Sequence, residues 1–185
     1  DHGLIVAQQE IGAGASEPSA ATSPRESDAQ RRTRRAIRKI QRMEALGAEV
    51  LVLDADVGDL EQMQQVVNAV DEQFGAIHGV IHGAGRTDPA AFALIEDTSI
   101  AQFEMQFRPK VKGLYVLDHL FRDKALDFRV LLSSNVSLLG GLRMVAYTSA
   151  NLFLDAFAQK ENRGSALPWT STNWDRWGYV EELLA

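Results

Sequence analysis

The sequence contains no cysteine, which excludes disulfide bonds, thiol catalysis and cysteine-ligated metals. It also lacks any apolar run of the roughly 18–20 residues that a membrane-spanning helix needs. The four histidines do not have the spacing of zinc ligands, so we expect no metal site. Basic residues are in the minority, 19 against 25 acidic ones, and the net charge of −6 argues against nucleic-acid binding. These absences favour a cytoplasmic protein that binds neither nucleic acid nor membranes.

The composition is that of one globular domain, with 45% hydrophobic and 24% charged residues in a chain of 185. Residues 3–7 predict one short strand, but 12–24 is mostly Gly, Ala, Ser, Thr and Pro. We therefore interpret residues 1–26 as a linker or disordered segment. The Gly12-Ala13-Gly14 turn is a poor nucleotide loop, because Pro18 follows it where a phosphate-binding helix should begin.

From residue 27 onward, short apolar runs alternate with amphipathic stretches. The apolar runs predict strands at 50–53, 77–81, 128–132 and 169–174. Helical spacing predicts helices at about 27–46, 59–74, 99–122 and 145–163, the third with a kink at Pro109. Such alternation indicates an α/β fold, a doubly wound parallel sheet with helices on both faces. We expect residues 27–185 to form this domain.

In such sheets, ligands bind beyond the carboxyl ends of the strands. Ser133 and Ser134 follow the third predicted strand, and Tyr147 opens the next helix. A serine hydroxyl facing a phenol can hold and protonate a carbonyl oxygen, but a free phenol titrates near ~10 and needs a neighbouring cation. Lys110 and Lys112 are the two candidates for that cation. The alternative is that Tyr147 only anchors the start of its helix through one hydrogen bond.

These segments together resemble the ketoreductase domain of modular polyketide synthases, a branch of the short-chain dehydrogenase/reductase superfamily with a Rossmann-like fold. Residues 106–110 and the Asn-Trp-Asp segment 173–175 look most like ketoreductases of bacterial hybrid peptide–polyketide assembly lines. The resemblance extends over about residues 30–178. The segments that carry it are 56–59, 82–85, 106–113, 130–134, 147–151, 154–158 and 173–177.

The resemblance implies a catalytic role for four residues. Tyr147 would be the general acid that protonates the β-keto oxygen as hydride arrives from NADPH, and Ser134 would orient that oxygen. Lys110 would lower the pKa of the phenol and hold the nicotinamide ribose. Asn151 would support the lysine and a water relay. The implied substrate is a β-ketoacyl thioester on the phosphopantetheine arm of an acyl carrier protein, with other synthase domains as further partners.

The resemblance also implies a cofactor-binding set. Asp56 would accept a hydrogen bond from the adenine amino group, with the backbone of Val57 beside it. The glycines at 83 and 85 would let the chain pass close to the cofactor, because no side chain stands in the way. The full set is Asp56, Val57, Gly83, Ala84, Gly85, Lys110, Ser133 and Tyr147.

One part of the family pattern has no counterpart here. The glycine-rich turn after the family's first strand is absent, and so is the basic residue after its second strand. In a sheet of order 3-2-1-4-5-6, the runs 50–53 and 77–81 are strands three and four, so two strands are lacking between them. Residues 3–7 can fill one place at most. We therefore expect a fragment or incomplete sheet without its first βαβ unit, with exposed strand edges and weak NADPH binding.

Two other interpretations stay open. A non-catalytic structural remnant of a megasynthase is favoured by the missing glycine turn and opposed by the complete set Ser134, Tyr147, Lys110 and Asn151. A free-standing short-chain dehydrogenase acting on a small alcohol or ketone is disfavoured, because Asn151 occupies the position where that superfamily has its lysine.

Overall fold

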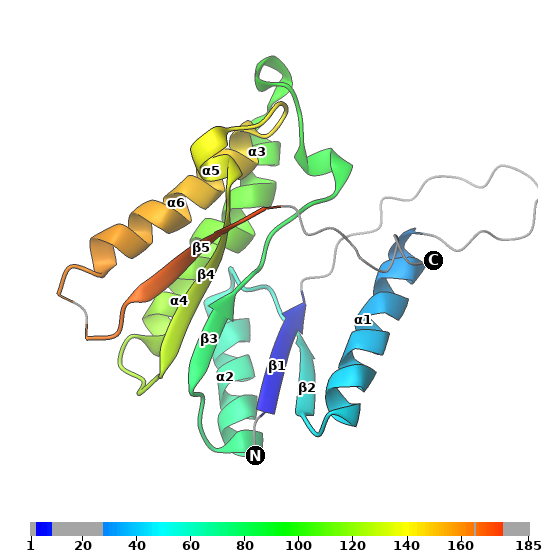
Figure 1. Ribbon diagram of the computed structural model, residues 1–185, viewed down its shortest axis with the longest axis vertical. Coiled ribbons are helices and arrows are strands. Elements are labelled where there is room, and N and C mark those ends of the chain that lie inside the picture. Colours follow the sequence, from blue (N-terminus) through cyan, green and yellow to red (C-terminus); the bar gives the residue numbers. More distant parts are fainter. Residues whose placement is uncertain (1–2, 9–27, 165, 176–185) are drawn as a thin grey trace, which may run out of the picture. The chain divides into compact units, whose positions relative to one another are not determined.

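The computed structural model describes residues 3–8, 28–164 and 166–175. The chain divides into two compact units, Asp1–Asp54 and Ala55–Ala185. Each unit is described by itself (Figure 1). Among the described residues, no helix combines the length and the apolar character needed to cross a membrane.

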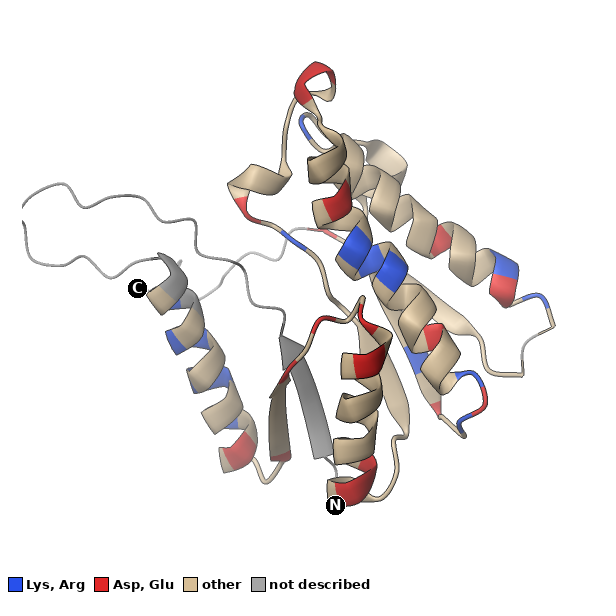
Figure 2. Cartoon of the chain, turned by 180° about the vertical axis from the view of Figure 1, so that it is seen from behind, with Lys and Arg blue, Asp and Glu red and all other residues tan. Residues whose placement is uncertain are grey.

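The first unit contains a two-stranded parallel sheet and one helix. Strand β1 (Gly3–Gln8) pairs with β2 (Glu49–Asp54), with Leu4 opposite Val50. Helix α1 (Asp28–Ala45) packs on β2. The strand predicted at 3–7 is therefore confirmed, whereas the Gly-, Ala- and Ser-rich run 12–24 lies outside the described residues. Lys and Arg side chains recur along α1 (Figure 2), and those that are described are exposed.

The second unit contains a three-stranded parallel sheet in the order β3-β4-β5. This sheet is separate from the β1-β2 sheet of the first unit. Two single-turn 3₁₀ helices, Pro89–Ala91 and Ile95–Asp97, lie between β3 and α3. The elements of the unit are α2 (Leu60–Phe74), β3 (Gly79–His82), α3 (Ile100–Phe107), α4 (Gly113–Phe121), β4 (Phe128–Ser134), α5 (Val136–Leu139), α6 (Val145–Glu161) and β5 (Trp169–Trp174).

Local sequence explains where these helices begin and end. The Asp59 carboxylate accepts a hydrogen bond of 3.0 Å from the backbone N–H of Gln62 and so caps α2. Gly75 ends α2 at φ 83°, a conformation that favours glycine. Ser99 and Gln102 form a reciprocal capping box at the start of α3. Each of these signals is readable in the sequence.

The long helix predicted over residues 99–122 is interrupted at Pro109, as the kink prediction required. A five-residue π-helical segment, Arg108–Lys112, joins α3 to α4. Proline has no N–H to donate to the preceding turn, so a local change in helical pitch relieves the conflict. The segment carries both candidate lysines: Lys110 is buried and Lys112 is exposed. The widened turn therefore separates the two lysines by environment.

In the described part of the second unit, one face of the sheet is buried and the other is exposed. Along β4, Arg129, Leu131 and Ser133 are buried, whereas Phe128 on the other face is 46% exposed. On β3, Ile81 is likewise exposed. Helix α6 packs on β4 and β5. Consecutive right-handed crossovers that step in one direction place their helices on a single face, which explains the one-sided burial.

A buried charge cluster lies at the amino end of β4. Arg129 Nη1 is 3.7 Å from Asp118 Oδ1, and its guanidinium lies 5.0 Å from the Trp169 ring centre. Arg129 also donates a hydrogen bond to the carbonyl oxygen of Leu167. Trp169 Nε1 donates to Asp118 Oδ1 at 3.1 Å, and Arg122 donates to the other carboxylate oxygen at 2.8 Å. This cluster joins α4, β4 and β5 at the amino end of β4.

Candidate active site

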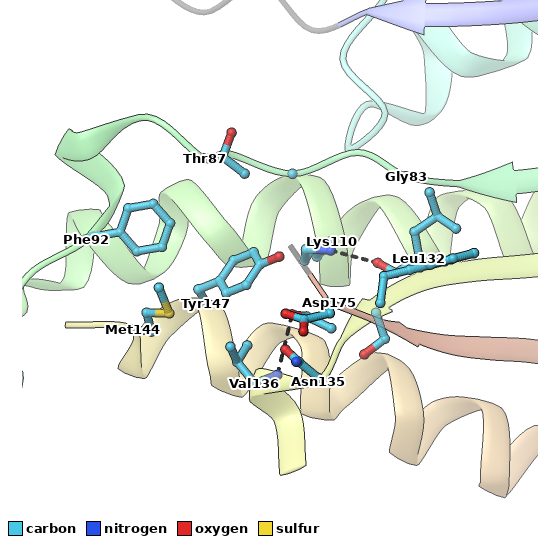
Figure 3. A pocket seen from close by; sticks show the side chains of 14 residues that line it. Gly83, Thr87, Phe92, Lys110, Leu132, Asn135, Val136, Met144, Tyr147 and Asp175 are labelled. Carbon is cyan, nitrogen blue, oxygen red and sulfur yellow. Dashed lines mark hydrogen bonds between the residues drawn. The ribbon is translucent and has the colours of Figure 1, made fainter. Parts of the chain in front are cut away.

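A cavity of about 620 Å³ opens at the carboxyl ends of β3, β4 and β5 (Figure 3). Parallel strands end at the same edge, so the segments that follow them meet there. The predicted residues that line the cavity are Gly83, Gly85, Lys110, Ser133, Ser134 and Tyr147. The structure thus brings six of the predicted site residues together, from four separate parts of the chain.

Lys110 is the buried cation of the cavity, only 4% exposed. Its Nζ donates a hydrogen bond of 3.1 Å to the carbonyl oxygen of Leu132 and lies 5.7 Å from the centre of the Tyr147 ring. Burial lowers the pKa of Lys110 from 10.5 to about 8, and the nearby Asp155 carboxylate opposes that lowering. None of the ion pairs among the described residues includes Lys110. Its charge is therefore solvated by a carbonyl and a ring rather than neutralised by contact.

Tyr147 presents its phenol to the interior of the cavity from the first turn of α6. Figure 3 shows its hydroxyl directed toward Lys110. The ring packs edge-on against Phe92 at a centre-to-centre distance of 5.8 Å, which fixes its orientation. The residue pattern alone leaves Lys110 and Lys112 as alternatives, the family resemblance implies Lys110, and the structure places Lys110 beside the tyrosine.

Ser133 and Ser134 form the turn that ends β4. Ser133 Oγ donates to the backbone oxygen of Asn151 at 3.3 Å, so this hydroxyl ties the strand to α6. Ser134 Oγ accepts from the backbone N–H of Val136 at 3.4 Å (Figure 3). The Asn135 N–H donates to the carbonyl oxygen of Trp174 at 3.0 Å, which ties the turn to β5. Because Ser134 Oγ only accepts in this geometry, its proton is available to a ligand in the cavity.

Asn151 lies beside the cavity rather than in its wall. Its Nδ2 donates to the backbone oxygen of Tyr147 at 2.8 Å, one turn earlier on α6. Its Oδ1 is buried and has no hydrogen-bond partner in the described part of the chain. The structure thus places Asn151 behind the tyrosine, holding the backbone of the helix start, and no direct hydrogen bond joins it to Lys110.

The structure does not bring Asp56, Val57 and Ala84 into the cavity wall. Asp56 Oδ2 pairs with Arg108 Nε at 2.7 Å, and its Oδ1 accepts from the Gly58 N–H at 2.8 Å. Val57 is buried, and Ala84 is half-buried. Asp56 is thus held at Arg108, the first residue of the π-helical segment, outside the wall of the cavity that Lys110 and Tyr147 line.

The glycines after β3 let the backbone pass close to neighbouring side chains, which a Cβ at either position would crowd. A Cβ on Gly85 would lie 3.0 Å from Cε of Lys110, and a Cβ on Gly83 would lie 3.0 Å from Cδ1 of Leu132. Such contacts are tighter than ordinary van der Waals distances. A bare backbone strip next to a cation and a phenol fits the flat ring and ribose of a nicotinamide nucleotide. The residues present therefore fit that half of the cofactor.

His82 holds the backbone of Lys110 through a hydrogen bond and is not a candidate metal ligand. It is 2% exposed, and its Nε2 donates to the backbone oxygen of Lys110 at 3.0 Å. Burial lowers the pKa of His82 from 6.5 to about 4, although this hydrogen bond opposes the effect. His82 is thus neutral at pH 7, so it fixes the backbone of the π-helical segment without adding charge.

Sequence reasoning missed several parts of the site. Phe92 and Met144 line the cavity near Tyr147, both on the side away from Lys110 (Figure 3), and they come from irregular segments with no periodic signal. Asp155 was visible in a motif but had no role assigned to it. Its spacing of eight from Tyr147 and four from Asn151 places all three on one face of α6, a signal that could have pointed to it.

A parallel sheet with a lysine, a tyrosine and a serine around one cavity at its carboxyl edge defines a Rossmann-type domain of the short-chain dehydrogenase/reductase class. Within that class, the chain belongs to the KR domain family, whose model matches residues 5–179. The resemblance drawn from the motifs is therefore confirmed.

The chain is similar to polyketide synthases and to ketoreductases from such synthases. The chain is 37% identical to 6-methylsalicylic acid synthase of Arthrobotrys oligospora, over 75% of this chain and 8% of that protein. It is 34% identical to the polyketide synthase PksM of Bacillus subtilis, over 76% of this chain and 3% of that protein. The chain thus spans less than a tenth of the length of these relatives.

Solved structures give the same result for the fold. The first ketoreductase of the tylosin polyketide synthase matches with a TM-score of 0.65 and 33% identity, over 77% of this chain and 30% of that one. An N-terminal ketoreductase from the macrolactin assembly line matches with a TM-score of 0.67 and 30% identity, over 78% of this chain and 29% of that one. The predicted α/β class, with an incomplete parallel sheet, is therefore confirmed.

Proposed function

We propose that this chain is the catalytic part of a polyketide synthase ketoreductase. It would reduce a β-ketoacyl thioester, carried on an acyl carrier protein, to the β-hydroxyacyl thioester with NADPH as reductant. The observation that carries this proposal is the pairing of Tyr147 with the buried cation of Lys110 across one cavity, with Ser134 at its floor. Membership of the KR family supports the reaction class.

The residues of the cavity divide the reaction between them. NADPH, when bound, supplies a hydride to the β-carbon. Tyr147 gives the proton of its hydroxyl to the carbonyl oxygen, so that the C=O bond becomes C–H and O–H. Ser134 Oγ donates a hydrogen bond to the same oxygen and orients it. The ammonium group of Lys110 stabilises the phenolate that remains on Tyr147.

The partners follow from the relatives. Those proteins are synthases of which a segment like this chain is a small part. We therefore infer that the substrate arrives on the phosphopantetheine arm of an acyl carrier protein, and that other synthase domains are the chain's neighbours. The strip of glycine backbone in the cavity suits NADPH. The apolar part of the cavity wall suits an acyl chain.

Tyr147→Phe tests the function. The variant keeps the ring and its contact with Phe92 but has no proton to give, so we expect NADPH oxidation with a short β-ketoacyl thioester to fall by ~10²–10⁴. NADPH binding, measured by calorimetry, should change little. Reduction by the phenylalanine variant at the wild-type rate would remove Tyr147 as the acid and leave the structural-remnant interpretation in its place.

A further inference from the structure

A hydrogen-bond network lies directly beneath the Ser133–Ser134 turn, and its centre is Asp155 of α6. Asp155 Oδ1 accepts from Ser171 Oγ of β5 at 2.5 Å. Its Oδ2 accepts from Ser137 Oγ of α5 at 2.7 Å and from Asn173 Nδ2 of β5 at 2.9 Å. One carboxylate thus joins three elements that surround the floor of the cavity.

Asn173 connects this carboxylate to the catalytic turn. Besides Asp155, its Nδ2 lies 3.2 Å from the backbone oxygen of Ser134 and 3.4 Å from Ser133 Oγ. It also lies 2.8 Å from Ser137 Oγ. An amide has two N–H groups, so these four acceptors share them. The position of the Ser134 carbonyl, and with it the turn that carries the Ser134 hydroxyl, therefore depends on how Asp155 holds the Asn173 amide.

The Asp155 carboxylate accepts these hydrogen bonds from neutral groups and has no cation in contact with it among the described residues. No ion pair among the described residues includes it. Burial alone would raise the pKa of Asp155, but the hydrogen bonds from Ser171, Ser137 and Asn173 outweigh that effect and lower it. The carboxylate is therefore ionised at neutral pH, with its negative charge confined under the cavity floor.

The cation that this negative charge acts on is Lys110. Of the other titratable groups around Lys110, His82 is neutral at pH 7, and Tyr147 and Asp175 line the same cavity. The Asp155 carboxylate opposes the effect of burial on Lys110 and raises its pKa. Without that charge, the ammonium group would be less stable in its buried position.

We propose that Asp155 is a positioning residue of this ketoreductase, which fixes the Ser133–Ser134 turn through Asn173. The proposal rests on the proposed function for its catalytic consequence. Its two structural consequences, the order of the turn and the protonation of Lys110, are measurable without turnover. Failure of the two ideas can therefore be told apart.

Three variants separate the effect of the position of the Asp155 carboxylate from the effect of its charge. Asp155→Asn keeps one accepting oxygen but removes the charge. Asp155→Glu keeps the charge but moves the carboxylate by one methylene, out of register with Asn173. Glu161→Gln is the matched control, since it makes the same carboxylate-to-amide change on α6 at a residue that pairs only with Lys160 among the ion pairs described.

The first measurement follows the lysine. Amine-labelled protein is titrated by NMR, with Lys110→Arg assigning the signal. We expect Asp155→Asn to shift the Lys110 midpoint to lower pH, whereas Asp155→Glu and Glu161→Gln keep it near the wild-type value. Each unit of lowering reduces the charged fraction about tenfold at pH above the midpoint. Where reduction is measured, the alkaline limb of the rate profile should move with that midpoint.

The second measurement follows the turn. Amide hydrogen exchange at Asn135 and Val136 should become faster in Asp155→Asn and Asp155→Glu, and should be unchanged in Glu161→Gln. Wild-type exchange and an unshifted Lys110 midpoint in Asp155→Asn would overturn the proposal. If both effects appear while Tyr147→Phe still reduces substrate at the wild-type rate, the positioning role stands and the proposed function falls.

Discussion

A buried cation lies at each end of strand β4, and the two cations differ in whether a carboxylate is in contact with them. At the amino end, Arg129 contacts Asp118, the Trp169 ring and a backbone carbonyl. At the carboxyl end, Lys110 contacts a carbonyl and the Tyr147 ring, with its countercharge on Asp155 beyond contact distance. The first arrangement holds the fold together. The second leaves a proton-binding group with a pKa of about 8 next to a phenol.

The difference has a simple electrostatic basis. A buried charge in contact with its counterion is stable only as a unit, so removing either partner leaves an uncompensated charge. A buried charge whose counterion is farther away stays close to its titration point, and small changes nearby alter its state. The chain therefore separates, within one strand, a cluster suited to stability from a cluster suited to acid–base chemistry.

Breaking the amino-end cluster should have the largest effect on stability. Arg129→Met leaves Asp118 and the Trp169 N–H with a disrupted network, and we expect the free energy of unfolding to fall by ~3–5 kcal/mol. Urea denaturation measures this loss. The double variant with Asp118→Leu should be less destabilised than the single variant, and equal or greater destabilisation would contradict the pairing.

The carboxyl-end cluster should show itself in the pH dependence of stability. The pKa of Lys110 is lower in the folded chain, about 8, than its ordinary value of 10.5. Between these values the unfolded chain binds more protons, so stability rises with pH over that range. Relative to Lys110→Met, wild-type stability should increase by about 3 kcal/mol from pH 7.5 to 10.5. Denaturation at both pH values measures this, and a constant difference would refute it.

A larger residue at Gly113, in the tightly packed segment next to Lys110, should also destabilise the fold. A Cβ on Gly113, at the end of the π-helical segment, would lie 2.8 Å from Val57 Cγ1 and 3.3 Å from His82 Cε1. We expect Gly113→Ala to cost ~1–3 kcal/mol in the free energy of unfolding. Thermal unfolding monitored by circular dichroism would detect it. Wild-type stability in this variant would show that the segment can shift.

Lys112→Ala should have the smallest effect. Lys112 is exposed on the same segment, so we expect a change of stability within about 0.5 kcal/mol. NADPH binding, measured by calorimetry, should also be unchanged, whereas Lys110→Ala should weaken it. The reverse outcome would transfer the role in the site from Lys110 to Lys112.

Much of the fold is predictable from the sequence because its signals are local. The cap at Asp59, the stop at Gly75 and the interruption at Pro109 each act through neighbouring residues, and the structure has all three. The meeting of Tyr147 and Ser134 is predictable too, since parallel strands end at one edge. The choice of Lys110 over Lys112 comes only from the family resemblance, because spacing along the sequence does not show the pitch of a π-helical turn.

The remaining features depend on contacts between distant segments. The one-sided burial of the sheet follows from the order of its crossovers rather than from any residue pattern. The pairing of Asp56 with Arg108 spans 52 positions in the chain and keeps this carboxylate outside the cavity wall. The network of Asp155 with Ser171 and Asn173 requires the register of β5 against α6. Spacing along the sequence contains none of this information.

The most direct test of the account is the titration of Lys110 itself in the wild-type chain. Amine NMR from pH 6 to 12, with the Lys110→Arg variant for assignment, gives its midpoint beside those of the other lysines. The account predicts a midpoint near 8, well below the ~10.4 of a solvated lysine. A midpoint at the ordinary value would contradict the buried, unpaired cation on which both the mechanism and the role of Asp155 depend.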